Sequence, residues 1–378
     1  MSAVLTEPSL CVTRLAGKEL PAALEADWNR LAGDIPCRRW DWLEPWWRHY
    51  GRNEGELFVL QAHDQNGQLV GLAPWYLRRR LGEGRVVRFL GSGNVCSDYL
   101  TIFAAPEQRT AVVNSIADWL NSDRPGWDLI ELNGGMASDQ ALQQLVDALS
   151  ERDHLIYQRR GESCWQLSLP DSWEEFLRTL STTRRSRVKK MVREYFDTGL
   201  AVAKVVDSVE QLSAGYRLLI ELHQKRRRSL DQPGCFADPV FIAYHQEVTE
   251  RFLQAGRLRL QYLMLEGRPV SVEYDLLGGD AIYHYQSGIE PEALESQPGR
   301  MGTVATIQAA IQNKMRTLDF MRGDEAYKSE WGAVAQPTWE TRIVAHRTSA
   351  HLRHSAWRAK HEMRQWAKSR WHQWRGDE

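Results

Sequence analysis

The chain lacks several features by which a sequence is often assigned to a class. Its five cysteines are scattered and form neither a CxxC pair nor a group with histidines at metal-ligand spacing: Cys11, Cys37, Cys96, Cys164 and Cys235. This usage predicts a reduced protein, and we expect no bound metal. No apolar run approaches the length of about 18 residues that a membrane-spanning helix needs. The first residues show no basic region followed by an apolar stretch, so we expect no secretory signal and a cytoplasmic protein.

The composition indicates a folded protein of two domains. The chain has 378 residues, of which 43% are hydrophobic, and this length exceeds what one compact domain usually needs. The formal net charge is −1, but it is unevenly distributed. Residues 342–375 hold nine lysines and arginines against one acid, Glu362. An acidic body therefore carries a basic C-terminal tail.

Hydrophobic periodicity predicts a similar order of elements in each half of the chain. The first half shows helical spacing over 25–50, strands over 56–62, 69–78, 85–90 and 99–103, a helix over 107–120, and a strand over 127–132. The second half shows helices over 183–198, 209–228 and 238–254, strands over 257–265, 269–277 and 281–287, a helix over 302–314, and a strand over 317–320. We expect an α/β (α+β) fold with two tandem lobes, 1–160 and 161–345, and a helical tail over 346–378. Each lobe would hold a mixed, mostly antiparallel sheet flanked by helices.

The most informative segment runs from Asp319 to Gly332. It reads Asp-Phe-Met-Arg-Gly-Asp-Glu-Ala-Tyr-Lys-Ser-Glu-Trp-Gly and includes the end of a short apolar strand. Within the seven residues 322–328 gather four ionisable side chains (Arg322, Asp324, Glu325 and Lys328) and the phenol of Tyr327. They lie at the end of a strand, where open α/β sheets place ligands. A solvated charged loop is the alternative interpretation.

This segment resembles the last motif of the bacterial CelD/BcsL-type acetyltransferases, relatives of the GNAT acyltransferases and of the Fem peptidoglycan aminoacyltransferases. Other pieces resemble the same family in the same order, within residues 25–345: the Trp-rich stretch 42–51, the strands 70–76 and 89–99, the basic helix 180–190, and the short motifs 236–239 and 285–288. The resemblance implies two GNAT-like lobes side by side, with the ligand groove at or near their interface. It also implies acetyl-coenzyme A as the acyl donor.

A donor of this kind needs a surface for its pyrophosphate. The segment before the helix expected at 302–314 supplies the candidates Gln297, Gly299, Arg300, Met301 and Gly302. Backbone N–H groups at a helix N-terminus attract anions, and glycines let a phosphate approach closely. The spacing departs from the GNAT pattern Gln/Arg-x-x-Gly-x-Gly/Ala, so a loop with two structural glycines is the alternative.

The resemblance assigns roles to the final motif. Many GNAT enzymes carry a tyrosine whose hydroxyl reaches the coenzyme A sulfur, so Tyr327 is the candidate general acid. The Tyr-Lys region of the Fem relatives lies by the reacting centre, so Lys328 would stabilise an oxyanion or bind a donor phosphate. Asp324 is a further catalytic candidate, whereas Arg322 and Glu325 are candidates for substrate binding. The structural alternatives are a half-buried tyrosine, a surface lysine, and acids that orient Arg322 or Lys328.

Three residues are candidates for the general base. Alternation places Glu273 and Asp275 on one face of the strand 269–277, and an acidic face on a central strand is unusual unless it lines a groove. His284 lies on the neighbouring strand and has a suitable intrinsic pKa. Glu273 is the preferred base, while a structural role is the alternative for His284.

Two basic groups could bind an anionic acceptor. Arg184 and Arg185 belong to the run 182–190 at a helix start, and His223 and Arg226 form a second group. Interleaved aromatics are missing and the body is acidic, so we expect no nucleic acid. A sugar, nucleotide-sugar or lipid-linked glycan suits these groups better, and a solvated basic helix is the alternative.

The tail 349–374 contains neither proline nor glycine and has an apolar stripe at helical spacing, flanked by arginine and lysine. Such a helix is typical of peripheral membrane or protein docking, here at the inner face of the membrane. A helix that packs back onto the acidic body is the alternative.

These features together predict an acyl-coenzyme A-dependent acyltransferase of the GNAT type. It would act on an amine or hydroxyl of a sugar or polysaccharide precursor, and the resemblance implies bacterial exopolysaccharide or cellulose-type biosynthesis. A Fem-like aminoacyltransferase that uses aminoacyl-tRNA and a peptidoglycan precursor is the first alternative. A non-catalytic scaffold of polysaccharide assembly, binding a nucleotide or a partner, is the second.

Overall fold

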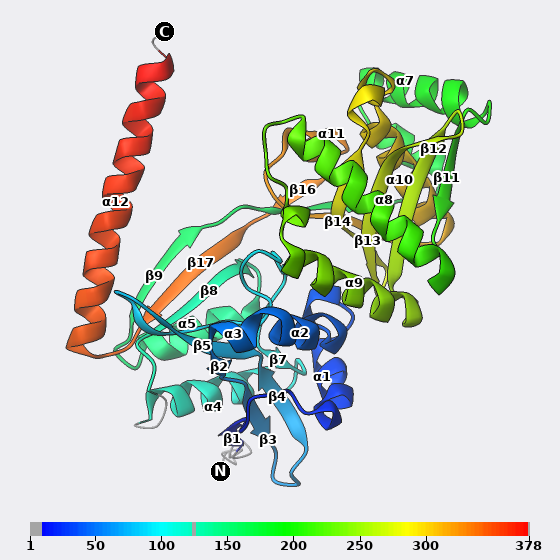
Figure 1. Cartoon of the computed structure of the whole chain (residues 1–378). Helices are drawn as coiled ribbons and strands as arrows, with labels where there is room; N and C mark the ends of the chain where they lie inside the picture. Colours follow the sequence, from blue (N-terminus) through cyan, green and yellow to red (C-terminus); the bar gives the residue numbers. More distant parts are fainter. Residues whose placement is uncertain (1–9, 123–125, 377–378) are drawn as a thin grey trace, which may run out of the picture.

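The chain folds into two lobes and a projecting helix (Figure 1). The computed structural model describes the backbone of residues 10–122 and 126–376, with the side chains of these residues as far as 363 and that of Trp366. The expected mixed α/β fold, with sheets flanked by helices, is confirmed. Within the described ranges, no helix combines the length and the apolar character needed to cross a bilayer.

The N-terminal lobe contains two sheets, where one was expected. The smaller sheet has the strand order β1 (Cys11–Arg14), β3 (Leu60–His63), β4 (Leu69–Ala73) and β7 (Phe103–Ala104). The larger sheet has the order β2 (Glu56–Leu57), β5 (Trp75–Arg80), β6 (Gly84–Phe89), β8 (Leu129–Met136), β17 (Thr338–Val344) and β9 (Leu155–Arg160). The strand expected over 69–78 divides at Pro74, because proline has no N–H to donate to a neighbouring strand.

The C-terminal lobe is built on one seven-stranded sheet. Its order is β11 (Ala201–Val205), β12 (Leu258–Leu265), β13 (Arg268–Gly278), β14 (Ala281–Ile289), β15 (Thr317–Arg322), β10 (Cys164–Ser168) and β16 (Val334–Gln336). All neighbours in this sheet are antiparallel except β14 and β15, which are parallel. The helix α10 (Pro298–Gln312), which joins β14 to β15, covers one face of the sheet, and helices α8 (Val209–Arg228) and α9 (Pro239–Gln254) pack on the sheet as well.

The helices alternate with these strands much as predicted. In the N-terminal lobe they are α1 (Glu25–Ala32), α2 (Trp40–Trp46), α3 (Arg52–Glu54), α4 (Arg109–Asn121) and α5 (Gln140–Ser150), with a π-helix at Trp47–Gly51. In the C-terminal lobe they are α6 (Trp173–Thr179), α7 (Thr182–Met191), α8 (Val209–Arg228), α9 (Pro239–Gln254), α10 (Pro298–Gln312) and α11 (Ala326–Glu330), with a second π-helix at Val192–Phe196. The tail forms α12 (Thr348–Gly376).

Strand β17 belongs to the N-terminal lobe, although the expected division of the chain placed its residues in the C-terminal lobe. The division at 345 assigned this segment to the second lobe, but β17 lies between β8 and β9 in the sheet of the first. Arg342 of β17 faces Glu131 of β8, and their ion pair measures 2.6 Å inside the sheet. The N-terminal lobe is therefore completed by the end of the chain.

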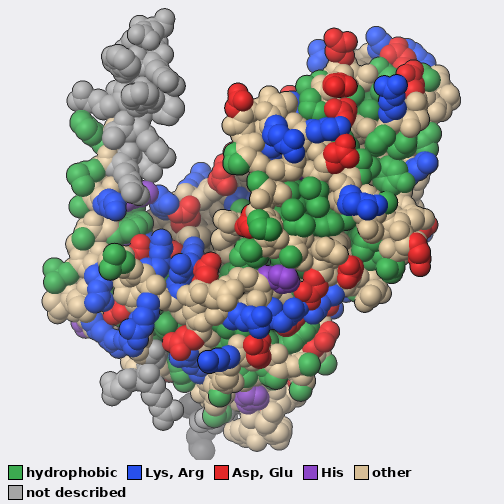
Figure 2. Space-filling view, in the orientation of Figure 1, with side chains coloured by type: hydrophobic (Ala, Val, Ile, Leu, Met, Phe, Trp, Pro, Cys, Tyr) green, Lys and Arg blue, Asp and Glu red, His purple; other side chains and the backbone are tan. Residues whose placement is uncertain are grey.

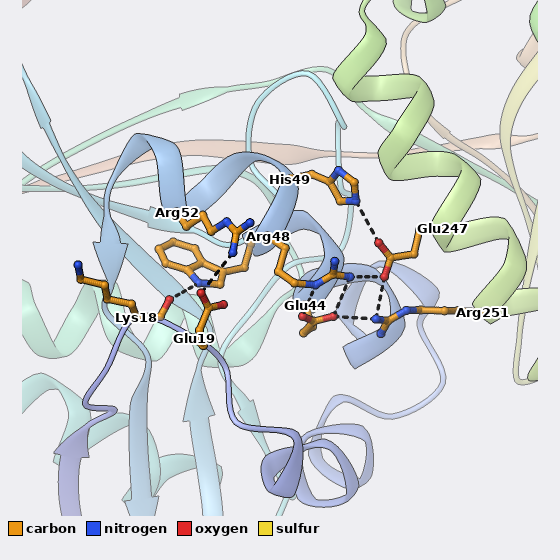
Figure 3. A network of polar contacts seen from close by, with 9 residues as sticks. Lys18, Glu19, Glu44, Arg48, His49, Arg52, Glu247 and Arg251 are labelled. Carbon is orange, nitrogen blue, oxygen red and sulfur yellow. Dashed lines mark hydrogen bonds and ion pairs between the residues drawn. The ribbon is translucent and has the colours of Figure 1, made fainter.

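Charged side chains of both lobes meet at the contact of α2 with α9 (Figure 3). Glu247 of α9 accepts a hydrogen bond from Arg48 and lies 3.0 Å from His49 Nε2. Arg251, one turn further on, bridges back to Glu44 at 3.0 Å and to Glu247 at 2.8 Å. Beside this network, one apolar core runs through both lobes without interruption. The lobes are thus fixed to one another by both packing and charge.

Candidate functional site

The parallel strands β14 and β15 separate shortly after they pair. Their register covers only Ala281–Tyr283 against Thr317–Asp319, although β14 continues to Ile289 and β15 to Arg322. A cavity of about 380 Å³ lies beside the part of β14 that does not pair with β15, and it is bounded by the start of α10 and by α11. Its lining residues are Glu273, His284, Ser287, Ile289, Leu294, Gln297, Pro298, Gly299, Arg300, Thr303, Tyr327, Glu330 and Trp331.

Six of the residues singled out in the sequence line this one cavity. They comprise two base candidates, the acid candidate and three donor-loop residues: Glu273, His284, Tyr327, Gln297, Gly299 and Arg300. They come from β13, β14, α11 and the start of α10. The fold therefore brings together residues up to 54 positions apart in sequence, which is the separation of Glu273 from Tyr327.

Glu273 is the most perturbed acid of the cavity. Its side chain is only 2% exposed, and burial raises the pKa of its carboxyl to about 7. Ser271 Oγ donates a hydrogen bond to Oε1 at 3.0 Å, and Gln261 Nε2 donates to Oε2 at 3.3 Å. A carboxyl with a pKa near neutrality can both accept and release a proton at physiological pH.

A second acid, Asp275, holds His284 in place. Asp275 is fully buried on the same face of β13 as Glu273, as alternation predicted. Its Oδ1 lies 2.7 Å from His284 Nδ1, and its Oδ2 accepts a hydrogen bond from Arg259 at 3.0 Å. Burial alone would lower the pKa of His284, but the hydrogen bond and charge of Asp275 outweigh it, so the pKa lies above its usual value. His284 therefore faces the cavity as an oriented, readily protonated imidazole.

The sequence interpretation did not single out Arg259 and Gln261, which support this network from β12. They occupy alternate positions of an otherwise apolar strand, directly opposite Asp275 and Glu273. Two polar residues on the inward face of a central strand are the signal that could have revealed them.

Tyr327 lies at the edge of the cavity on α11. Its side chain is 42% exposed, and its ring packs edge-on against Phe320 at 6.0 Å between centroids. Partial burial raises the pKa of its phenol to about 12, so the hydroxyl keeps its proton near neutral pH. The group can therefore act as a donor of a hydrogen bond or a proton toward the cavity.

Helix α10 begins at Pro298, four residues before the expected start at Gly302. Gln297 precedes it in the left-handed region, with φ 57°, and Pro298 suits the first helical turn. The candidate donor loop is therefore the first turn of a helix. Met301 is completely buried and does not line the cavity, which removes it as a side-chain contact for a donor.

Two glycines of this turn lie close to neighbouring strands. A Cβ at Gly302 would approach Glu273 Oε1 to 1.8 Å, whereas one at Gly299 would meet the flexible end of Ile289, at 2.7 Å from Cδ1. The absence of a side chain at Gly302 therefore lets the helix lie directly against Glu273.

A smaller pocket continues the cavity toward α7. The two share Arg300, Glu330 and Trp331, and the smaller one adds Arg184 and Arg187. Arg300 pairs with Glu330 at 3.0 Å across their common edge. Arg187, which the sequence interpretation did not select, thus joins Arg184 and Arg300 in a basic rim at the mouth of the cavity.

The remaining residues of the final motif shape the loop behind the cavity. Lys328 is 2% exposed, and its Nζ donates to the carbonyls of Met321, Arg322 and Gly323 at 2.9–3.3 Å. Glu325 pairs with Lys328 at 2.9 Å, which agrees with an orienting role. None of these residues lines the cavity.

Arg322 and Asp324 point to other partners. Arg322 forms an ion pair of 2.9 Å with Asp98 of the N-terminal lobe. Asp324 Oδ1 accepts from Trp165 Nε1 at 3.1 Å on β10. Arg322 thus links the two lobes, and Asp324 ties its loop to β10.

Three residues of the proposed basic patches lie away from the cavity. Arg185 turns back to donate to the carbonyls of Arg178 and Leu180 at the end of α6. His223 is buried on α8, where burial lowers the pKa of its imidazole to about 4, so it is uncharged and unsuited to anion binding. Arg226 is on α8 and contacts Ser229.

Comparisons with known proteins agree with this geometry. Residues 181–329 match the acetyltransferase (GNAT) domain family, a span that contains nearly the whole cavity. No curated protein sequence matches the chain. Among solved structures the chain is similar to FemX, with 11% identity over 81% of this chain and 90% of that one, and a TM-score of 0.58.

Two further structures share the fold. L-PGS from Bacillus licheniformis is 10% identical, covers 92% of this chain and 98% of its own, and has a TM-score of 0.52. A conserved protein of unknown function from Bacteroides thetaiotaomicron is 11% identical, covers 86% and 98%, and has a TM-score of 0.55. At these identities the likeness establishes the fold alone. Residues 181–329 thus match an acetyltransferase (GNAT) domain, within a chain whose fold is similar to that of FemX.

Proposed function

We propose that the protein is an N-acyltransferase that uses an acyl-coenzyme A, in the first instance acetyl-coenzyme A. The observation that carries the proposal is the cavity beside β14 and the start of α10, which is lined both by Glu273, a buried acid with a pKa of about 7, and by the protonated phenol of Tyr327. The match of residues 181–329 to the GNAT domain supports the same reaction class.

The start of α10 and the basic rim are suited to the donor. In the first turn of α10, Pro298 has no N–H, and the N–H groups of Arg300 and Met301 donate to the carbonyl of Gln297. The N–H of Gly299 is therefore the group of this turn that would meet a pyrophosphate. Arg184, Arg187 and Arg300 supply positive charge along the edge shared by the two pockets. In this arrangement Arg300 exchanges Glu330 for a donor phosphate.

The bound thioester supplies an acyl group to an attacking amine and leaves as a thiolate. Glu273 takes the proton that the amine nitrogen releases, because its pKa is close to the working pH. Tyr327 provides the proton at the leaving sulfur through its hydroxyl. Asp275 orients His284, whose positive charge helps to keep part of the Glu273 population ionised.

For the acceptor, we propose a sugar or polysaccharide precursor. The resemblance of the final motif to CelD/BcsL-type acetyltransferases supports a role in bacterial exopolysaccharide or cellulose-type biosynthesis. The acceptor would enter beside Tyr327 and Glu273 with its amine or hydroxyl toward the carboxyl.

A second candidate is an aminoacyl donor carried by tRNA. The likeness of the fold to FemX favours it, together with the sequence resemblance to Fem proteins. The carboxyl of Glu273 and the phenol of Tyr327 would serve aminoacyl transfer as well. The identity of the bound donor therefore distinguishes acyl transfer from coenzyme A from aminoacyl transfer from tRNA.

The decisive experiment is calorimetric titration of the full chain with acetyl-coenzyme A. We expect saturable binding that weakens about tenfold in Arg187→Ala, since a lost arginine–phosphate contact costs about 1.4 kcal/mol. Arg226→Ala is the matched control, because Arg226 is a partly exposed arginine on α8 that does not line either pocket. Absence of binding by a folded chain would reject the proposal, and activity with aminoacyl-tRNA would then support the second candidate.

A further inference from the structure

Helix α12 presents two opposite faces, one of which packs on the N-terminal lobe. The face toward the N-terminal lobe, called here the anchoring face, consists of Ala350, His354, Trp357 and His361. The opposite face, called here the outer stripe, consists of Leu352, Ala356, Ala359, Met363 and Trp366. With 3.6 residues per turn, about 100° per residue, the two sets lie about half a turn apart.

The anchoring face holds the helix against β9 and β17. Ala350 and His354 are buried, and Trp357 stacks on the guanidinium of Arg342 at 3.8 Å. The ring of Tyr157 on β9 packs edge-on against the rings of His354 and Trp357, with 5.7 Å between centroids in each case. The expected alternative, a helix that packs back onto the body, therefore holds for the anchoring face.

The outer stripe faces solvent. Leu352 is 67% exposed, Met363 64% and Trp366 62%. Hydrophobic side chains follow the side of the lower part of α12 that is turned away from the protein (Figure 2), and the helix continues beyond the sheet on which it is anchored (Figure 1). The anchoring contacts thus present the stripe outward.

The segment that forms α12 is rich in basic residues. Residues 348–376 contain seven basic residues against one acid, Glu362: Arg353, Arg358, Lys360, Arg364, Lys368, Arg370 and Arg375. Of these, Arg353 pairs with Asp128 at 3.2 Å and Arg358 with Glu362 at 3.0 Å. Since the whole chain has a net charge of −1, the rest of it is acidic.

We propose that the outer stripe of α12 binds the surface of an anionic phospholipid bilayer. A tryptophan, a methionine and a leucine on one side of a basic helix are the combination that inserts at the headgroup boundary and is attracted by negative lipids. The helix lies in the bilayer surface along its outer stripe, and the anchoring face keeps the N-terminal lobe attached to it. Membrane binding in this form needs neither donor nor acceptor, so it is independent of the proposed acyl transfer.

The test is co-sedimentation of the full chain with vesicles. One set contains phosphatidylcholine alone, and the other an equal mixture of phosphatidylcholine and phosphatidylglycerol. We expect binding to the mixed vesicles that weakens as salt is added, and little binding to phosphatidylcholine alone.

Paired variants separate the stripe from the rest of the helix. Met363→Gln/Trp366→Gln should weaken binding to the mixed vesicles about tenfold or more without changing net charge. The control Ser349→Gln/Ser355→Gln makes the same number of glutamines at exposed positions outside the stripe and should bind like the unmodified chain. Circular dichroism should be unchanged in both, because none of the four residues is buried.

Three results would overturn the proposal: no binding of the unmodified chain to anionic vesicles, equal binding to both vesicle types, or full binding by the stripe variant. If the chain is instead a dimer that the stripe variant converts to a monomer, the stripe is an interface between two copies.

Discussion

Glu273 combines burial with a place at the base of the cavity, and this combination determines the pH dependence of activity. As the proposed base it must be ionised, so the rate should rise with pH through about 7. Glu273→Gln should lower the rate at saturating substrate about 100-fold or more and remove this rise. Steady-state release of coenzyme A measured from pH 5.5 to 8.5, a window of about three units around the pKa, checks this. A variant that keeps the inflection near pH 7 would assign it to another group.

The same carboxyl should also make stability depend on pH. Its pKa rises from 4.5 to about 7 on folding, so between these values the folded state holds a proton that the unfolded chain has released. The contribution of Glu273 to the free energy of unfolding therefore falls as pH rises through this window. Relative to the unmodified chain, Glu273→Gln should gain about 1–3 kcal/mol between pH 4.5 and pH 7. Urea unfolding at several pH values measures the difference, and a constant difference would contradict it.

Lys328 shows how a residue predicted to be catalytic can be structural. Its buried ammonium donates to three consecutive carbonyls, so Lys328→Met should lower the free energy of unfolding by about 2–4 kcal/mol. Glu325→Gln is the control and should cost less than about 1 kcal/mol, because the Glu325 side chain is 59% exposed. Lost activity with unchanged stability in Lys328→Met would instead restore the catalytic role.

At the scale of elements, the approach of α10 to β13 depends on Gly302. A methyl group there would meet Glu273 Oε1 at 1.8 Å, so Gly302→Ala should lower the free energy of unfolding by about 1–3 kcal/mol. Shortening the opposing side chain should relieve the contact. We therefore expect Gly302→Ala/Glu273→Ala to be at least about 1 kcal/mol more stable than the sum of the single changes predicts. If the two single changes in the free energy of unfolding simply add in the double variant, α10 accommodates the methyl group without meeting Glu273.

Most elements around the site could be predicted from the sequence, because their signals are local. The alternation of β13 placed Glu273 and Asp275 on one face, and the apolar run before Arg322 marked β15. The start of α10 was misplaced because Gly299 and Gly302 suggested a loop, whereas packing against Glu273 favours glycine at Gly302 inside the helix. Local composition could not reveal this, since the neighbour that favours glycine lies on β13.

Partners far apart in sequence were the least predictable part of the site. Nothing near Lys328 indicates that its charge is buried under its own loop, and nothing near Arg322 indicates Asp98 as its partner. Strand β17 likewise pairs with β8 and β9, and no local signal in its own sequence specifies these neighbours.

For the molecule as a whole, the shared core and β17 predict one cooperative unit. One hydrophobic cluster extends through both lobes, and the charged network around Glu247 joins them. Calorimetry should therefore show a single unfolding transition. Two well-separated transitions would mean that the lobes unfold independently.

Truncation tests the same point from the end of the chain. A chain that ends at Gln336 lacks β17 and α12 and should fail to fold, because the larger sheet of the N-terminal lobe loses its strand between β8 and β9. A chain that ends at His346 keeps β17 and should remain folded, with the free energy of unfolding reduced by about 1–4 kcal/mol through loss of the anchoring face. Equal behaviour of the two chains would show that β17 is dispensable.

The position of β17 also bears on how the protein is made. A ribosome delivers the N-terminal lobe first, but the sheet of that lobe stays incomplete until Thr338–Val344 has emerged. By then every strand of the C-terminal lobe has been synthesised. The lobe that is translated first is thus the last to be completed, and the newly made chain must keep the place between β8 and β9 open throughout.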